Sequence, residues 1–331
     1  MHAIRLHAFG PADNLRYETL PDPTPGAGQV RISVAAAGVH LVDTALRKGL
    51  PGPYPIPELP TVPGREVAGT IDAVGAEVDP GWAGKQVVAH LGMAPGGYAE
   101  LAVTEVARLH EIPSGLSPAE AVAMIGTGRT TMGILQFTEL GPDSVAIVTA
   151  AAGGIGTLLV QYAKNAGATV IGLAGGAAKV ELVQRNGADL AVDYLGSDWP
   201  AKVRGFLADR RATVLFDSVG GDIARAAIDL LGKGGQHLVF GASGQSPKDA
   251  AALTLPDTEL AARGITSEFV LGPPMLQRAG GDVRVLEDRA MAEAGAGRLR
   301  PAVHTFPLAD AATAHHALET RATTGKVVLI P

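Results

Sequence analysis

The chain has 331 residues, of which 47 % are hydrophobic and 18 % are charged, a balance that excludes intrinsic disorder and favours two folded domains. Its net charge of −6 and the lack of any Lys/Arg-rich run argue against nucleic acid or an anionic membrane surface as a partner. Cysteine is absent, which excludes disulfides, thiolate nucleophiles and cysteine-liganded metals.

The N-terminus, MHAIRLHAFG, lacks the basic region and the apolar core of a secretory signal peptide. No run of about 18 apolar residues is present to cross a bilayer. We therefore expect a cytoplasmic protein with no membrane partner.

The first third of the chain consists of short segments, rich in β-branched residues, between Gly and Pro. Strands are expected over residues 29–39, 66–75, 85–92 and 96–105. Segment 51–64 is too rich in proline to form a regular element, because each proline removes a backbone donor, and we expect a rigid surface loop there. The pattern predicts a compact, mostly β, barrel-like unit.

A helix start follows this β-rich part. Ser117 is a suitable N-cap, Pro118 fits the first helical position, and Glu120 completes a capping box. The pattern of predicted elements changes here from mostly strands to a mixture of helices and strands, which suggests a domain boundary near residue 120.

From residue 144 onward, apolar strand-like runs alternate with amphipathic helical stretches. Strands are expected over 144–150, 168–174, 189–194, 212–219 and 235–242, and helices over 154–166, 177–186, 198–208 and 222–232. Buried strands joined by helical crossovers predict a parallel, doubly wound sheet. After residue 265 the chain has another strand-like segment and a helix, and its end, a helix and then a strand, is expected to return to the first domain.

The stretch TAAAGGIG (149–156) lies between a predicted strand and a predicted helix, the context of a dinucleotide site. Gly153 allows the tight turn, Gly154 lets a pyrophosphate approach the main chain, and Gly156 lets the helix pack closely on the strand. Free N–H groups near Gly154 and Ile155 then face the anion. Such a turn can be purely structural, but the series of β–α units favours a nucleotide.

The end of the second predicted strand decides between NAD and NADP. An NAD site expects an acidic residue there, whereas this chain reads GLAGGAAK (172–179). Gly175 and Gly176 leave room for a 2′-phosphate, and Lys179 supplies a cation, although a solvated lysine on a helix face is the alternative. NADPH is therefore the expected cofactor.

Seven segments together resemble the zinc-independent quinone oxidoreductase (zeta-crystallin-like) branch of the medium-chain dehydrogenase/reductase superfamily. They are AAAGV (35–39), VPGREVAGTIDAVG (62–75), GGYAE (96–100), AAAGGIG (150–156), FDSVGG (216–221), FGASG (240–244) and RATTGKVVLIP (321–331). The resemblance implies an α/β protein with a GroES-like β-barrel catalytic domain, 1–120 completed by 265–331. It further implies a Rossmann-type NADP-binding domain over 121–264, a cofactor in the cleft between the two, and a homodimer.

The resemblance also assigns cofactor contacts. They are Ala152, Gly153, Gly154, Ile155 and Gly156 at the turn, Gly175, Lys179, Tyr194 and Arg321 around the 2′-phosphate, and Thr130, Val219, Phe240, Gly241, Phe269 and Leu271 near the nicotinamide. Core packing would explain most of the last group equally well. This chain departs from the family in having two glycines where Ser or Thr is common near 175–176.

Zinc-dependent relatives carry metal ligands at positions that here hold His40, Arg65 and, near the third, Gly126 or Thr127. A zinc site needs three protein ligands and tolerates no cation among them, so we expect no metal. Without such a Lewis acid, a quinone or an α,β-unsaturated carbonyl is the better hydride acceptor, because charge spreads over a phenolate or enolate.

His40 stands where the family's quinone reductases commonly have asparagine. We expect it to donate a hydrogen bond or a proton to the substrate oxygen, with Asp43 orienting its ring and Thr130 completing the catalytic set. A partly buried histidine satisfied by the backbone is the alternative. For the whole chain the alternatives are an enoyl-thioester or other alkene reductase, and a weakly catalytic NADPH-binding sensor or structural protein.

Overall fold

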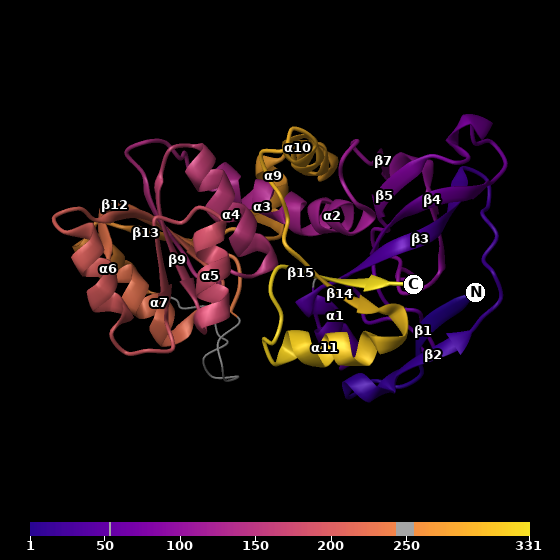
Figure 1. Cartoon of the computed structure of the whole chain (residues 1–331), viewed down its shortest axis with the longest axis horizontal. Coiled ribbons are helices and arrows are strands. Elements are labelled where there is room, and N and C mark those ends of the chain that lie inside the picture. Colours follow the sequence, from indigo (N-terminus) through magenta and orange to yellow (C-terminus); the bar gives the residue numbers. More distant parts are fainter. Residues whose placement is uncertain (53, 243–254) are drawn as a thin grey trace. The chain divides into compact units, whose positions relative to one another are not determined.

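The computed structural model describes residues 1–52, 54–242 and 255–331 (Figure 1). The chain divides into two compact units, each with its own sheet and core. Unit 1 comprises Met1–Arg129 and Glu287–Pro331, and unit 2 comprises Thr130–Leu286. The expected α/β class, a GroES-like domain and a Rossmann-type domain, is confirmed.

Unit 1 is built on a seven-stranded sheet in the order β14-β15-β3-β4-β5-β7, with β6 paired to β3. Its strands are β3 (Gln29–Val39), β4 (Glu66–Val74), β5 (Gln86–His90), β6 (Leu101–Glu105), β7 (Leu109–Glu111), β14 (Val303–Pro307) and β15 (Lys326–Ile330), and β1 (His2–Leu6) and β2 (Leu15–Thr19) form a separate pair. β14 and β15 are parallel, and the other pairings are antiparallel.

The C-terminal strand lies inside this sheet, between β14 and β3. Its register pairs Val327 with Val39 and Leu329 with Ala37. The start of β15 therefore lies beside the end of β3, which brings Lys326 next to residue 40. The return of the C-terminus to the first domain is confirmed.

The helices of unit 1 are short. They are α1 (Leu41–Arg47), α2 (Pro118–Ala123), α11 (Ala311–Glu319) and the turns η1 (Ala12–Asn14), η2 (Pro80–Trp82), η3 (Val106–Arg108) and η6 (Leu308–Asp310), while α10 (Arg284–Gly295) begins in unit 2. The predicted capping box of α2 is confirmed, because the Ser117 side chain accepts from the Glu120 amide and the Glu120 carboxylate accepts from the Ser117 amide. One π-helical turn, η4 (Met124–Gly128), follows α2 directly.

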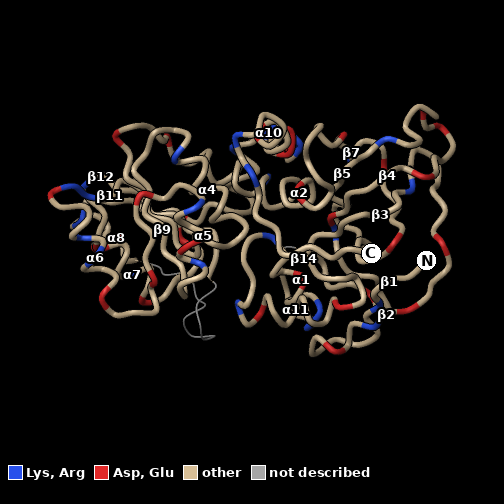
Figure 2. The backbone as a smooth tube through the Cα atoms, in the orientation of Figure 1, with Lys and Arg blue, Asp and Glu red and all other residues tan. Residues whose placement is uncertain are grey.

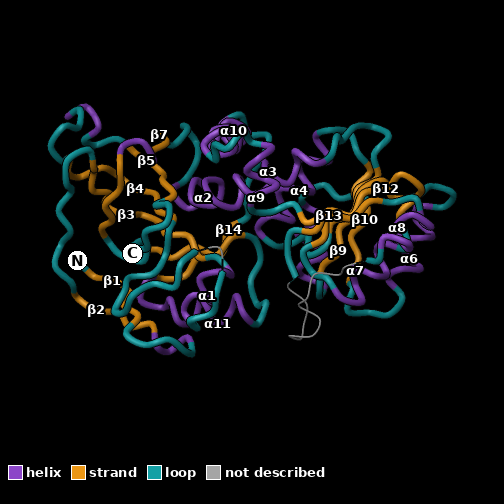
Figure 3. Tube along the Cα trace, turned by 180° about the vertical axis from the view of Figure 1, so that it is seen from behind, coloured by secondary structure: helices purple, strands orange, loops and turns teal. Residues whose placement is uncertain are grey.

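Unit 2 has a six-stranded parallel sheet in the order β10-β9-β8-β11-β12-β13. Figure 3 shows its strands in orange among the purple helices. Its strands are β8 (Val145–Val148), β9 (Thr169–Ala174), β10 (Leu190–Asp193), β11 (Ala212–Asp217), β12 (Leu231–Val239) and β13 (Thr266–Phe269). Its helices are α3 (Arg129–Ile134, which starts at the last residue of unit 1), η5 (Leu135–Phe137), α4 (Gly154–Asn165), α5 (Ala177–Arg185), α6 (Trp199–Leu207), α7 (Gly221–Ile228), α8 (Asp257–Arg263) and α9 (Pro273–Arg278). The strand order reverses between β8 and β11, and ligands of open α/β sheets bind at such a point.

The division between the units lies later in the chain than positions 120 and 264, where the sequence pattern had put it. Residues 265–286 carry β13, which pairs with β12 and so extends the sheet of unit 2. Strand β12 also starts at Leu231 and not at 235, because Leu231 pairs with Ala212 across a register shift.

Charged residues of both signs are interspersed over both units (Figure 2). Among the described residues, no helix combines the length and the apolar character needed to span a bilayer.

Candidate functional site

The glycine turn of unit 2 brings helix and strand backbones into direct contact. A Cβ at Gly156 would overlap the carbonyl oxygen of Ala150 and lie 2.7 Å from Cα of Ala151. Gly153 is the N-cap of α4, and its amide donates to the Ala150 carbonyl over 2.8 Å. The turn therefore requires glycine at 156 for steric reasons.

Helix α4 presents a favourable site for an anion at this turn. It is 12 residues long and has no acidic residue in its first turn. Ala152 is buried, whereas Gly153, Gly154 and Ile155 are half-buried. Free N–H groups and the helix dipole at such an end stabilise phosphate oxygens, so the turn fits the expected pyrophosphate.

Asp217, at the end of β11, organises the neighbouring turn. Its Oδ1 accepts hydrogen bonds from the Thr149 hydroxyl (3.1 Å) and from the amides of Val219 (3.0 Å) and Gly220 (3.2 Å). The Thr149 hydroxyl oxygen in turn accepts from the Ser218 amide over 2.9 Å. The buried carboxylate thus ties the ends of β8 and β11 together at the reversal of strand order. Asp217 belongs to the FDSVGG segment, in which nothing in the sequence alone distinguishes it as a site residue.

The residues expected around a 2′-phosphate are partly brought together. A Cβ at Gly175 would lie 3.4 Å from the hydroxyl oxygen of Tyr194, so these two positions adjoin. Lys179 is half-buried in the first turn of α5. Arg321 belongs to unit 1 and has a left-handed backbone, with φ of 58°.

An acidic residue that the sequence analysis missed lies at the same corner of unit 2. The Asp193 carboxylate accepts from the amides of Gly176 and Leu195, each over 3.0 Å. These two hydrogen bonds lower the pKa of Asp193. Residues 172–179 give no indication of this carboxylate, because Asp193 ends the next strand, β10.

Three of the residues expected near the nicotinamide line the ends of β11 and β12. Val219 and Phe240 are buried, and a Cβ at Gly241 would lie 3.2 Å from the Ser218 carbonyl oxygen. The others lie elsewhere in unit 2: Thr130 is half-buried on α3, Phe269 ends the edge strand β13 with 54 % of its surface exposed, and Leu271 is half-buried. The motif segment 240–244 falls partly outside the described residues.

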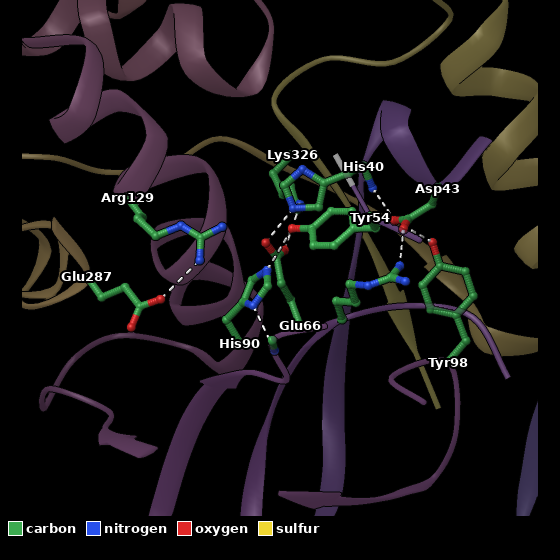
Figure 4. Close-up of polar contacts among 11 residues, drawn as sticks. His40, Asp43, Tyr54, Glu66, His90, Tyr98, Arg129, Glu287 and Lys326 are labelled. Carbon is green, nitrogen blue, oxygen red and sulfur yellow. Dashed lines mark hydrogen bonds and ion pairs between the residues drawn. The ribbon is translucent and has the colours of Figure 1, made fainter. Parts of the chain in front are cut away.

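The polar centre of unit 1 lies where three strands begin or end (Figure 4). His40 follows β3, Glu66 starts β4 and Lys326 starts β15. The His40 Nε2 contacts both the Glu66 Oε1 and the Lys326 Nζ, the latter at 2.5 Å, and Nζ lies 2.8 Å from the other carboxylate oxygen of Glu66. Sequence reasoning singled out His40 but neither of its partners.

These three side chains differ in burial. Glu66 is fully buried and the Lys326 side chain is 4 % exposed, whereas 31 % of the His40 side chain is exposed. Burial opposes ionisation of Glu66, but electrostatic attraction to His40 and Lys326 holds its pKa well below the ordinary value. Burial lowers the pKa of Lys326, against the opposing pull of Glu66.

Asp43 acts on the main chain of His40 and not on its ring. Its Oδ2 accepts from the His40 amide (2.8 Å) and from the Tyr98 hydroxyl (3.2 Å), and Arg65 lies 3.8 Å from its other oxygen. The expectation that Asp43 orients the imidazole is therefore wrong, because Glu66 and Lys326 are the residues that contact Nε2 of the ring. The i, i+3 spacing that suggested a ring contact places Asp43 at the third residue of α1, where a carboxylate reaches back to the N-cap amide.

A second histidine, His90, has a defined tautomer. Its Nδ1 accepts from the Gly92 amide over 3.0 Å, so the proton of the neutral ring is on Nε2, which lies 3.3 Å from the Tyr54 hydroxyl oxygen. Burial and the nearby Arg129 guanidinium lower the pKa of His90 to about 3. His90 therefore donates to Tyr54, whose own O–H is left to donate elsewhere. The loop 51–64, expected to be a surface loop, contributes this hydroxyl to the site.

The donor set of this centre does not fit a catalytic zinc. The Lys326 ammonium lies against the imidazole nitrogen of His40, and Arg65, at the position of a second ligand, places its guanidinium 4.3 Å from the centre of the Tyr54 ring. Zinc requires three neutral or anionic donors. Among residues 1–52, 54–242 and 255–331, no three His, Asp or Glu side chains are gathered as a metal site.

Comparison with known proteins agrees with this architecture. Residues 26–114 match the family model described as alcohol dehydrogenase GroES-like domain, and residues 154–272 match the one described as zinc-binding dehydrogenase. The chain is 32 % identical to a quinone oxidoreductase of Pseudomonas aeruginosa, over 99 % of both chains. It is 30 % identical to a 2-haloacrylate reductase of a Burkholderia species, over 99 % of this chain and 98 % of that one. The structure of Escherichia coli quinone oxidoreductase complexed with NADPH superposes with a TM-score of 0.84 at 28 % identity, over 100 % of both chains.

Proposed function

The chain belongs to the quinone oxidoreductase branch of the medium-chain dehydrogenase/reductase superfamily, and from that premise we propose that it is an NADPH-dependent, zinc-independent reductase of quinones or α,β-unsaturated carbonyls. The glycine turn before α4 carries this proposal. Its backbone excludes any side chain at Gly156 and offers helix amides to a phosphate. The similar Escherichia coli enzyme was solved with NADPH.

The residues that would hold NADPH are those that the family pattern assigns. The pyrophosphate would bind the turn Ala152–Gly156, the 2′-phosphate would bind Gly175, Lys179, Tyr194 and Arg321, and the nicotinamide would meet Thr130, Val219, Phe240, Gly241, Phe269 and Leu271. When bound, NADPH supplies a hydride. The chain's own task is then to stabilise the oxyanion that the substrate becomes and to protonate it.

Unit 1 offers two donors for that task. His40 is partly exposed at the polar centre, and the Tyr54 O–H is free to donate because His90 supplies the hydrogen bond to its oxygen. Donors of this kind stabilise a phenolate or an enolate, in which charge is already delocalised. The similarity to a 2-haloacrylate reductase supports conjugated C=C bonds as acceptors beside quinones.

The test is a substrate panel with the purified protein. NADPH oxidation is followed by absorbance with simple quinones, enones, acyl thioesters and, as a control, a saturated aldehyde. We expect turnover with quinones or enones and none with the aldehyde. Preference for acyl thioesters would favour the alkene reductase alternative, and NADPH binding without turnover on any acceptor would favour a sensor or structural protein.

Lys179→Ala tests the coenzyme preference. We expect the KM for NADPH to rise by about 10-fold, equivalent to about 1.4 kcal/mol, because a charge-assisted contact to the phosphate is lost. The KM for NADH should not change. Lys202→Ala, which removes an exposed lysine of the same unit paired with Asp198, is the matched control. Equal losses with both coenzymes would mean that the phosphate pocket is misassigned.

We further propose that the protein is a homodimer, as the branch pattern implies. Among the described residues β13 is the outermost strand of its sheet, and this position and the exposed Phe269 at its end support an interface there. Sedimentation that reports a 33.7 kDa species at all concentrations would contradict this proposal.

A further inference from the structure

A row of polar side chains crosses neighbouring strands of the sheet in unit 2. It runs from Ser267 on β13 through His237 on β12 and Asp217 on β11 to Thr149, the residue after β8. The sheet register pairs His237 with Ser267 on one side and with Leu215, two residues before Asp217, on the other. Parallel strands that are covered on both faces are usually apolar, so packing alone does not account for this row.

Hydrogen bonds join His237 to both of its neighbours in the row. Its Nε2 lies 3.3 Å from Oδ2 of Asp217, and its Nδ1 lies 2.8 Å from the Ser267 hydroxyl oxygen. An ionised carboxylate only accepts, so in the neutral ring Nε2 carries the proton and Nδ1 accepts from the Ser267 hydroxyl. Both nitrogens of the imidazole are then satisfied, although the side chain is fully buried.

The inner end of the row lies at the turn that is expected to meet the nicotinamide. Oδ1 of Asp217 accepts from the amides of Val219 and Gly220, whereas Oδ2 faces His237. Among the residues that the structure describes, Oδ2 is bonded to His237 alone. The imidazole therefore fixes the rotation of the carboxylate about its Cβ–Cγ bond, and with it the oxygen that holds the two amides.

We propose that His237 is a positioning residue for NADPH, which acts through Asp217 on the turn at Val219 and Gly220. It holds the carboxylate in the orientation in which Oδ1 reaches both amides, and the turn then keeps the shape that receives the nicotinamide. His237 is fully buried and so acts on the coenzyme only through this contact. This inference rests on the proposed function, which assigns the nicotinamide to this turn.

Three substitutions at position 237 separate the two hydrogen bonds of the ring. His237→Phe removes both, His237→Asn retains an acceptor near the position of Nδ1, and His237→Gln retains a donor near the position of Nε2. We expect the dissociation constant for NADPH to rise about 10-fold in the first two variants, because each loses a hydrogen bond to a charged carboxylate. His237→Gln should stay within about 3-fold of the wild type, because the bond to Asp217 is kept.

A second ligand, 2′,5′-ADP, separates positioning of the nicotinamide from a general loss of structure. It carries the 2′-phosphate but no nicotinamide, so its affinity should be the same in all three variants and in the wild type. Gln236→Met is the matched control, because Gln236 precedes His237 on β12 and its side chain bonds to Thr138 and Phe137 and not to the row. It should leave the affinities for both ligands unchanged. Calorimetric titration measures all of these proteins.

The possible outcomes are distinguishable. NADPH affinity in His237→Phe equal to that of a binding-competent wild type would overturn the inference. An equal loss of NADPH and 2′,5′-ADP affinity would also overturn it, because the effect would then be a general one on the fold. A wild-type protein that binds neither ligand would overturn the proposed function and the inference that rests on it.

A spectroscopic test needs neither ligand. In coenzyme-free protein with ¹⁵N-labelled histidine, the long-range ¹H–¹⁵N signals of His237 should be those of the Nε2–H tautomer. His237→Gln identifies these signals among those of the nine histidines. The Nδ1–H tautomer would overturn the inference, because Nε2 could then not donate to Asp217.

Discussion

Replacing Glu66 by alanine should lower the free energy of unfolding by about 3–5 kcal/mol. The substitution leaves the Lys326 ammonium, 4 % exposed, without the carboxylate that lies 2.8 Å away. It also removes a contact of the His40 ring. Denaturant unfolding at neutral pH measures the effect, with the slope of the transition checked for two-state behaviour.

Two controls separate the buried charge from other causes. Glu181→Gln breaks an ion pair with Arg185 in which both side chains are more than 60 % exposed, so it should cost at most about 0.5 kcal/mol. The double variant Glu66→Gln with Lys326→Met should recover most of the loss, because neither charge then lacks a partner. A Glu66→Ala protein as stable as the wild type would show that Lys326 is neutral or hydrated in the native state.

The Glu66–Lys326 pair also predicts how the stability difference between the wild type and Glu66→Ala depends on pH. The pKa of Glu66 is depressed in the folded protein, so its contribution to stability is fully present above the pKa of the unfolded chain and is lost as pH falls through the folded pKa. The stability gap between wild type and Glu66→Ala should therefore narrow in acid.

The sequence predicted those elements whose formation depends on residues that are close together in the chain. The turn at Gly153–Gly156 and the capping box at Ser117 need residues within a few positions of one another. The alternation of strands and helices after residue 144 likewise depends on short-range periodicity. These features were placed in the sequence to within a few residues.

The polar centre could not be predicted in the same way. His40 and Lys326 are 286 positions apart, and they meet because β15 pairs with the end of β3. Within the sequence Lys326 is the first residue of an apolar strand, a place where a lysine usually reaches solvent. Glu66 similarly begins a strand, and nothing nearby in the sequence shows that it is buried.

Gly126 illustrates a constraint that becomes visible only with the fold. It lies in the π-helical turn η4, and a Cβ there would overlap the carboxylate of Glu66. In the sequence this glycine is notable only because it stands near the position of a metal ligand in zinc-dependent relatives. Its small size instead leaves room for the buried carboxylate, and π-turns often occur at functional sites.

Gly156→Ala should weaken NADPH binding by about 10-fold or more, equivalent to at least about 1.4 kcal/mol. The added methyl group would overlap the Ala150 carbonyl oxygen and press on Cα of Ala151, both of them backbone atoms that no rotamer change can move. The start of α4 must then shift away from the turn, and the amides that would hold the pyrophosphate shift with it. Overpacking of this kind should also cost about 1–3 kcal/mol of stability.

Gly205→Ala is the matched control, because it makes the same change inside helix α6, where a Cβ would meet nothing within 4 Å. This variant should bind NADPH normally and gain up to about 1 kcal/mol of stability from helix propensity. Calorimetric titration with NADPH measures both proteins under the same conditions. If Gly156→Ala bound NADPH as tightly as Gly205→Ala, the coenzyme would not lie on this turn, because close approach of helix and strand backbones is the property that the added methyl group removes.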